Sequence, residues 1–140
     1  MTPDGILETV LYAKDLAAIE GFYRDVLGME PFQRAAGRHL FYRCGGPGRE
    51  QVLLIFNAIA TSVPASGDAL PVPPHGMEGE GHVCFRASAA ELEAWRRRLT
   101  EMRVAIEADF EWPAGGRSIY FRDPAGNCLE FAEPKIWGLD

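Results

Sequence analysis

Two polar residues occupy matching positions in two otherwise apolar segments of this chain. Glu8 lies within the segment ILETVLY, at residues 6–12, and His82 lies within GHVCF, at residues 81–85. Each segment is followed by a turn and by a stretch with helical spacing, so the two halves repeat one order of elements. Carboxylates and imidazoles bind divalent ions and transfer protons. A repeat that keeps a polar residue at the same place indicates one shared site.

A third polar residue, Glu130, lies in the segment CLEFA at residues 128–132. Side chains alternate between the two faces of a strand, so each of these segments has a polar face and an apolar face. We expect the apolar faces, which include Leu7, to be covered by helices. Glu8, His82 and Glu130 are then predicted to point away from those helices.

Two amphipathic helices are predicted, one in each half. The first covers residues 16–27, with Asp15 as its N-cap. The second covers residues 89–102 and begins with a capping box formed by Ser88 and Glu91. Its predicted buried stripe consists of Leu92, Trp95, Leu99 and Met102.

Each helix is followed by a hairpin-like pair of strands, at 40–43 with 52–57 and at 118–122 with 128–132. Between the halves, residues 58–80 are rich in Pro, Gly and Ser, which predicts a linker without an element of its own. A connection of this length is either disordered or functional, for example a lid or an arm that reaches a neighbouring subunit.

Size and composition favour one compact domain, because the chain has 140 residues of which 47% are hydrophobic. The net charge of −6, without a basic cluster, argues against nucleic acid and anionic membrane surfaces as partners. Neither a membrane-spanning apolar run nor a secretory signal is evident, so we expect a cytoplasmic protein. The three cysteines form no C-x-x-C pair, which argues against a disulfide framework or a structural zinc site.

Three segments together resemble a known family. ETVLYAKDL at residues 8–16, GHVCF at 81–85 and YFRDPAGNCLEF at 120–131 are similar to the strands and closing hairpin of the vicinal oxygen chelate superfamily. That superfamily contains glyoxalase I, extradiol dioxygenases and the bleomycin and fosfomycin resistance proteins. The resemblance covers nearly the whole chain except the linker. It specifies the fold rather than the reaction, because the family supports many chemistries on one scaffold.

The resemblance implies an α+β fold in a single domain spanning residues 1–140. Two tandem βαβββ modules form a curled mixed sheet around a cleft, with the helices on the outer face. The first module covers about residues 5–57, the linker about 58–80 and the second module about 81–134. The resemblance also implies a homodimer, in which a second copy covers sheet edges.

A metal site follows from the same resemblance. It implies a divalent transition metal, Fe, Mn, Ni, Co or Zn, held by Glu8, His82 and Glu130, with positions left for water or a bidentate substrate. Glu8 or Glu130 is then also available as a catalytic base. Tyr120, ten residues before Glu130, either donates a hydrogen bond to the substrate or forms a wall of the cleft.

Two departures separate this chain from the family's best known reactions. The fourth ligand position of glyoxalase I is predicted to fall at about Leu53, which cannot bind a metal. Asn57 lies further along the same face of that strand and can reach the cleft, but it is a poor substitute for a metal ligand. Extradiol dioxygenases have a histidine where this chain has Glu8, so neither chemistry transfers directly.

Two functions therefore stay open at this stage. One is a metal-dependent enzyme, of lyase, isomerase or dioxygenase type, that acts on a small substrate with vicinal oxygens. The other is a metal-free protein of the bleomycin-resistance type, which binds a planar small molecule between aromatic side chains. The first predicts that Glu8, His82 and Glu130 converge, and the second predicts that they diverge.

Overall fold

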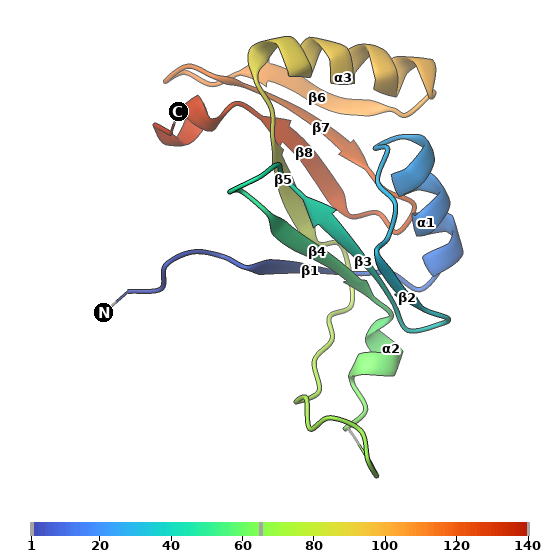
Figure 1. Cartoon of the computed structure of the whole chain (residues 1–140). Helices are drawn as coiled ribbons and strands as arrows, with labels where there is room; N and C mark the ends of the chain where they lie inside the picture. The colour runs from blue at the N-terminus through green and yellow to red at the C-terminus, as the bar shows by residue number, and fades with distance from the viewer. Residues whose placement is uncertain (1, 65, 140) are drawn as a thin grey trace. The chain divides into compact units, whose positions relative to one another are not determined.

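The computed structural model describes residues 2–64 and 66–139 of the chain, and it divides into two compact units, residues 1–80 and 81–140. Both units run strand, helix and then three strands (Figure 1). The α+β class and the two tandem βαβββ modules are confirmed. The grouping of both modules into one domain stays a prediction.

The first unit contains a mixed sheet of four strands and one main helix. Its elements are β1 (Glu8–Tyr12), α1 (Leu16–Asp25), β2 (Gln33–Ala35), β3 (His39–Cys44) and β4 (Gln51–Phe56). The strand order is β1-β4-β3-β2, in which β1 and β4 are parallel and the other neighbours are antiparallel.

The second unit repeats this topology. Its elements are β5 (His82–Arg86), α3 (Ala89–Glu101), β6 (Ile106–Glu111), β7 (Arg117–Arg122), β8 (Cys128–Ala132) and the 3₁₀-helix η1 (Pro134–Trp137). The strand order is β5-β8-β7-β6, again with one parallel pair, β5 and β8. In Figure 1 the helix α3 runs along one side of β6 and β7.

Helix α1 begins as predicted, because the Asp15 carboxylate accepts a hydrogen bond from the Ala18 amide at 3.0 Å. Its buried face includes Tyr23, which stacks on Tyr42 of β3 at a centroid distance of 5.2 Å. The helix ends at Asp25, two residues before the predicted end. The sheet face toward α1 is therefore the face that carries Tyr42.

Helix α3 carries the predicted capping box. The Ser88 hydroxyl accepts from the Glu91 amide at 3.3 Å, and the Glu91 carboxylate accepts from the Ser88 amide at 2.7 Å. Leu92 and Leu99 are fully buried, and Trp95 stacks on a phenylalanine of β8. These contacts fix which face of the second sheet lies under the helix.

Two predicted core positions are wrong. Met102 is 39% exposed, because the helix ends at Glu101 and Met102 is its C-cap. Leu7 is 75% exposed, because β1 begins only at Glu8 and Leu7 lies before the paired strand. Both errors arise at element ends, where a periodic pattern extends beyond the packed segment.

The segment 58–80 is not devoid of structure, contrary to the prediction. It begins with the short helix α2 (Ala58–Thr61), capped by Asn57, whose side-chain oxygen accepts from the Ile59 amide at 3.1 Å. Asn57 is therefore a capping residue, not the site residue that the sequence suggested. The segment then folds back, with the His75 amide donating to the Thr61 carbonyl at 3.0 Å.

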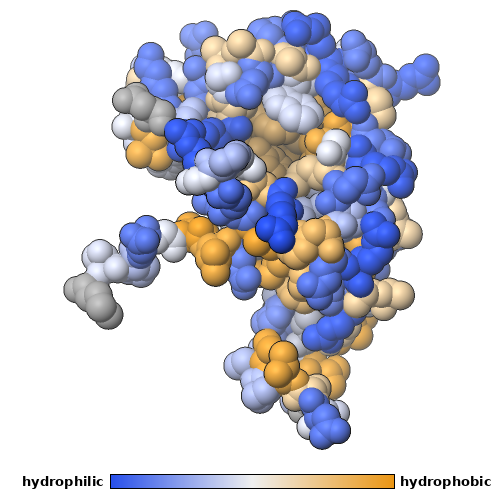
Figure 2. All heavy atoms as spheres, in the orientation of Figure 1, coloured by the Kyte–Doolittle hydropathy of each residue, from blue (hydrophilic) through white to orange (hydrophobic). Residues whose placement is uncertain are grey.

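Figure 2 shows hydrophilic residues over α3 and hydrophobic residues along the segment that follows α2. Large exposed apolar side chains of this segment include Val63, Leu70 and Val72. Within residues 2–64 and 66–139, no helix is long and apolar enough to cross a membrane.

We expect Ser88→Ala to lower the free energy of unfolding by about 1 kcal/mol, the usual cost of losing an N-cap hydroxyl. The matched control is Ser62→Ala, whose hydroxyl donates only to the Ile59 carbonyl at the end of α2. Urea unfolding followed by circular dichroism measures both. Equal stabilities of the two variants would show that the capping box contributes nothing.

Candidate functional site

The parallel pair β5 and β8 places the candidate residues of the second unit. His82 is opposite Cys128, and Cys84 is opposite Glu130. All four lie on the sheet face away from α3, because Phe131, the neighbour of Glu130, stacks on the helix. The predicted orientation of His82 and Glu130 is therefore confirmed.

A buried turn fixes where β5 begins. The Asp123 carboxylate accepts from the amides of Ala125 at 2.9 Å and Asn127 at 3.0 Å, and from the Asn127 side chain at 2.9 Å. The Asn127 side-chain oxygen in turn accepts from the Gly81 amide at 2.8 Å. Gly81 precedes His82, so this turn positions the imidazole. The motif DPAGN was visible in the sequence, but this role was not assigned from it.

His82 and Glu130 form a close pair, with Nε2 of His82 at 3.3 Å from Oε2 of Glu130. The other ring nitrogen, Nδ1, lies 2.9 Å from the carbonyl oxygen of Cys128. Because a carbonyl only accepts, we assign the ring proton to Nδ1. The Nε2 atom then faces the carboxylate with its lone pair, so a proton or a cation between the two atoms completes the contact.

The residue Glu130 is 5% exposed. The second oxygen of its carboxylate, Oε1, is buried and has no hydrogen-bond partner among the described residues. The Tyr120 hydroxyl and the Cys84 thiol are the donors beside this carboxylate. A cation bound by the carboxylate would satisfy Oε1 directly. Backbone fixation of Nδ1 and a free Nε2 are also the usual state of a metal-binding histidine. The pair therefore fits a divalent ion.

Tyr120 of β7 lies directly opposite Glu130, and its ring is nearly parallel to that of His82 at a centroid distance of 6.3 Å. Burial, followed by the neighbouring Glu130 carboxylate, raises the pKa of Tyr120 to about 12. The phenol is thus a stable proton donor at neutral pH. The structure brings Tyr120 to the pair, while its catalytic role stays a prediction.

Cys84 shares this face but is not prepared for chemistry. The residue is exposed, but desolvation by the groups packed around its thiol, followed by the charge of Glu130, raises the pKa of the thiol to about 12. A thiol in that state is a poor nucleophile and a poor ligand at neutral pH. The three cysteines form no disulfide among the described residues.

Glu8 is the counterpart of His82 in the first unit. It faces Val52 across the parallel pair β1 and β4, as His82 faces Cys128. The same register makes Leu54, not Leu53, the counterpart of Glu130, which corrects the prediction by one residue. The loop between β3 and β4 is longer than the turn before β8, and this difference obscured the alignment. Leu54 is equally unable to bind a metal.

Glu8 belongs to the first unit. Its binding of a metal ion together with His82 and Glu130 stays a prediction. Among residues 2–64 and 66–139, no group of three or more His, Cys, Asp or Glu side chains is arranged to hold a metal ion. Of the three predicted ligands, the structure brings together His82 and Glu130, both from the second unit.

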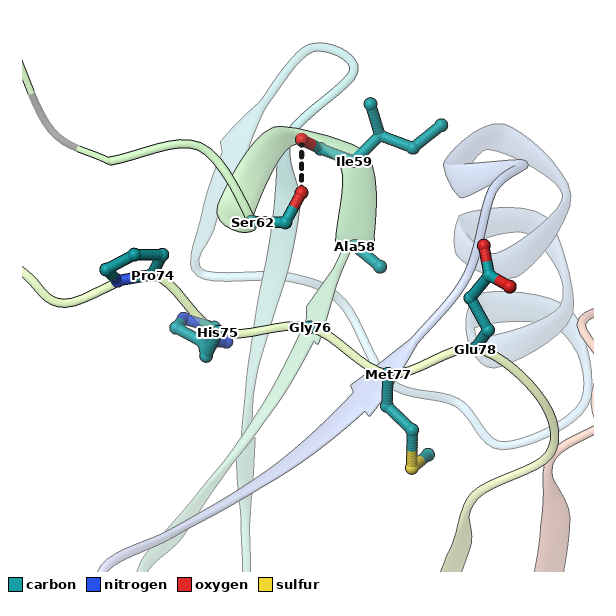
Figure 3. A pocket seen from close by; sticks show the side chains of 8 residues that line it. All are labelled: Ala58, Ile59, Ser62, Pro74, His75, Gly76, Met77 and Glu78. Atoms are coloured by element: carbon teal, nitrogen blue, oxygen red, sulfur yellow. Dashed lines mark hydrogen bonds between the residues drawn. The ribbon is translucent and has the colours of Figure 1, made fainter.

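The remaining histidines lie in the first unit. His39 is buried, its ring nitrogens have no partner among the described residues, and its ring stacks on Phe41 at 4.0 Å. Burial lowers the pKa of His39. Nδ1 of His75 and the Tyr12 hydroxyl share a hydrogen bond of 2.7 Å. It also lines an open hollow of about 470 Å³ beside α2 (Figure 3).

Comparison with known proteins identifies the family. The model described as the Glyoxalase/Bleomycin resistance protein/Dioxygenase superfamily matches residues 5–131. The chain belongs to this superfamily. The predicted resemblance is thereby confirmed over most of the chain, including both candidate strands. A search of curated proteins gives no match.

Solved structures agree with this assignment. Lactoylglutathione lyase from Agrobacterium tumefaciens is 44% identical, with a TM-score of 0.87 over 99% of this chain and 100% of that chain. A glyoxalase/bleomycin resistance protein/dioxygenase from Nocardioides is 25% identical, with a TM-score of 0.68 over 95% and 85%. A glyoxalase family protein from Bacillus anthracis, at 17% identity and a TM-score of 0.67 over 95% and 97%, shares the fold.

We expect the phenolate absorbance of Tyr120 to appear near pH 12, not near the ordinary value of 10. The folded state holds this proton more tightly than the unfolded chain, so its contribution to stability is complete below pH 10 and declines as the pH rises toward 12. The difference between the ultraviolet titrations of the native protein and Tyr120→Phe isolates the group, with circular dichroism confirming the fold. A step near pH 10 in folded protein would contradict the described burial.

Proposed function

We propose that this chain is a divalent-metal-dependent enzyme that acts on a small substrate with vicinal oxygens, by a lyase, isomerase or dioxygenase reaction. The observation that carries the proposal is the His82 and Glu130 pair. Its Nε2 and Oε2 atoms face each other at 3.3 Å, and Oε1 is buried and unpaired. These two donor atoms are close enough to bind one ion.

Glu8 is proposed as the third protein ligand. The internal repeat supports this role, because Glu8 occupies the strand position that His82 occupies in the second unit. One imidazole and two carboxylates suit Fe(II), Mn(II), Ni(II), Co(II) or Zn(II). Such an ion, when bound, polarises substrate oxygens and stabilises negative charge on them.

The residues around the pair would orient and protonate the substrate. Tyr120 keeps its proton at neutral pH and stands beside His82, so it can donate a hydrogen bond to a substrate oxygen. Glu8 and Glu130 are the carboxylates available as a base. The Asp123 and Asn127 turn holds His82 in place through Gly81.

The relative named lactoylglutathione lyase makes lactoylglutathione the first compound to test. Leu54 stands at the first-unit position that corresponds to Glu130, where glyoxalase I is expected to have its fourth metal ligand. This substitution supports a site with three protein ligands rather than four. We also propose that the protein is a cytoplasmic homodimer, in line with the family resemblance.

A metal-free binding protein is the second candidate. It is supported by a row of aromatic rings that leads away from His82 on the same sheet face, formed by Tyr120 and Phe110. Such a surface suits a planar ligand whether or not a metal is present.

We expect protein purified without a metal-affinity tag to contain about one transition metal per chain, because a cation bound by Nε2 of His82 and by the Glu130 carboxylate completes their contact. His82→Ala should lose this metal. His75→Ala is the matched control, since it removes an imidazole that bonds to Tyr12 instead. Elemental analysis and titration of the chelated protein measure the content. A metal-free native protein that takes up none of the five ions would favour the binding protein.

Glu8→Ala should weaken metal binding more than about 10-fold, because even loss of a partner outside the ligand shell costs 10- to 100-fold. Glu50→Ala is the control, because the Glu50 carboxylate is exposed and accepts only from the Gly48 amide. Competition with a chromogenic chelator gives both affinities. Unchanged affinity in Glu8→Ala would remove Glu8 from the site and leave the second unit's pair intact.

A further inference from the structure

An aromatic row runs across the second sheet from His82 to the edge strand β6. The Tyr120 ring is 6.3 Å from His82 at an interplanar angle of 20°. The Phe110 ring is 6.0 Å from Tyr120 at 6°, and Trp112 is 5.0 Å from Phe110 at 55°. Phe110 lies opposite Ser118, which alternates with Ile119 and so shares the face of Tyr120. The row is therefore continuous with the candidate site.

The outer end of this row is exposed. Phe110 and Trp112 are 40% and 38% exposed, whereas Ile119 and Phe121, on the opposite face, are fully buried under α3. The two outer rings thus contribute little to the core of this unit. Large apolar side chains left together at the surface commonly mark a ligand or partner surface.

Trp112 is held rigidly. Its indole N–H donates to the Ser118 hydroxyl at 2.8 Å, and its backbone amide donates to the Gly116 carbonyl at 2.8 Å. The turn requires Gly116, which has φ of +86° and would place a Cβ atom 2.7 Å from Ile136. A fixed aromatic surface loses little conformational entropy when a ligand binds.

The spacing of the rings restricts where a ligand can lie. A ring inserted between two parallel rings needs them about 7 Å apart, twice the contact distance of roughly 3.5 Å. The centroids of Phe110 and Tyr120 are only 6.0 Å apart. A ligand ring does not fit between Phe110 and Tyr120, and the exposed surfaces of Phe110 and Trp112, whose planes are 55° apart, remain available to it.

We propose that Phe110 and Trp112 form a specificity platform for a planar aromatic or conjugated group carried by the ligand of the His82 and Glu130 site. The ligand spans Tyr120, with its vicinal oxygens toward His82 and its ring on the platform. The position of the oxygens rests on the proposed function, but the ring contact needs no metal.

The edge strand itself argues for a small ligand rather than another sheet. Glu107, Asp109 and Glu111 lie along β6, and the first two are held in ion pairs with Arg122 and Arg117 of β7. Charged side chains on an edge strand oppose pairing with a second strand. The apolar surface beside them consists of two rings, which suits one planar group.

Two hydroxamates test the platform. Pentanohydroxamate and 5-phenylpentanohydroxamate present the same two vicinal oxygens on the same alkyl chain, which is long enough to pass Tyr120, and differ in the terminal ring. We expect Zn(II)-loaded protein to bind the phenyl compound about 2- to 10-fold more tightly, the gain typical of one aromatic contact. Phe110→Leu and Trp112→Leu should bring this ratio to near 1 and leave pentanohydroxamate affinity unchanged. Trp95→Leu, which alters a tryptophan on the opposite face, should keep the ratio.

An affinity ratio that is the same in all variants would overturn the platform. If the native protein binds neither hydroxamate, the proposed metal function fails. Binding of benzamide to metal-free protein then tests the ring contact of the platform independently of the metal. The expected result is a benzamide-dependent shift of the Trp112 indole N–H signal in nuclear magnetic resonance, absent with acetamide; no shift overturns the proposal. A change of oligomeric state in Phe110→Leu or Trp112→Leu, with the ratio retained, would identify a subunit contact instead.

Discussion

The geometry of the candidate site depends on the junction between the starts of β5 and β8, where the Gly81 amide donates to the Asn127 side chain and the Gly81 carbonyl accepts from the Cys128 amide, both at 2.8 Å. Strands β5 and β8 are parallel and distant in sequence, so no tight turn sets their register. Asn127 lies immediately before β8 and holds the residue immediately before β5. A slip of one residue would turn every side chain of a strand to the other face, and His82 would then lie under α3. The register also places Glu130 between Cys84 and Tyr120.

Burial of the Glu130 carboxylate costs free energy, which apolar packing elsewhere in the unit offsets. The opposite face of the sheet provides this packing, since Phe121, Leu129 and Phe131 are buried between the sheet and α3. The helix is further tied to the sheet by Arg117 of β7, which forms ion pairs with Asp109 of β6 and with Glu93 of α3. These pairs raise the pKa of Arg117, so its charge is permanent. Packing and ion pairs on one face thus support an unpaired polar atom on the other.

Periodicity predicted those features that depend on neighbours in sequence. The N-cap at Asp15, the capping box at Ser88 and the outward orientation of Glu130 were all predictable from spacing. Strands β2 and β6 could not be located from the sequence, because one has three residues and the other alternates acidic with apolar side chains. The counterpart of Glu130 was misplaced by one residue because loop length, which sets the register of β4, has no periodic signal. The bond from Asn127 to Gly81 joins distant segments, and spacing alone does not reveal it.

The two units have diverged in the chemistry of one equivalent face. In the second unit Glu130 has Cys84 and Tyr120 as its neighbours across the ladders, and in the first unit Leu54 has Val10 and Phe41. The first unit keeps Glu8 at the position of His82, and its other polar residues on this face, Tyr12, His39 and Arg43, lie at other positions. Because Leu54 stands at the position of Glu130, the paired imidazole and carboxylate of the second unit have no counterpart at the equivalent positions of the first. His39 stacks on Phe41 and meets Phe56 edge-on. The surroundings of Leu54 are therefore packed with rings, whereas the equivalent surroundings of Glu130 stay polar.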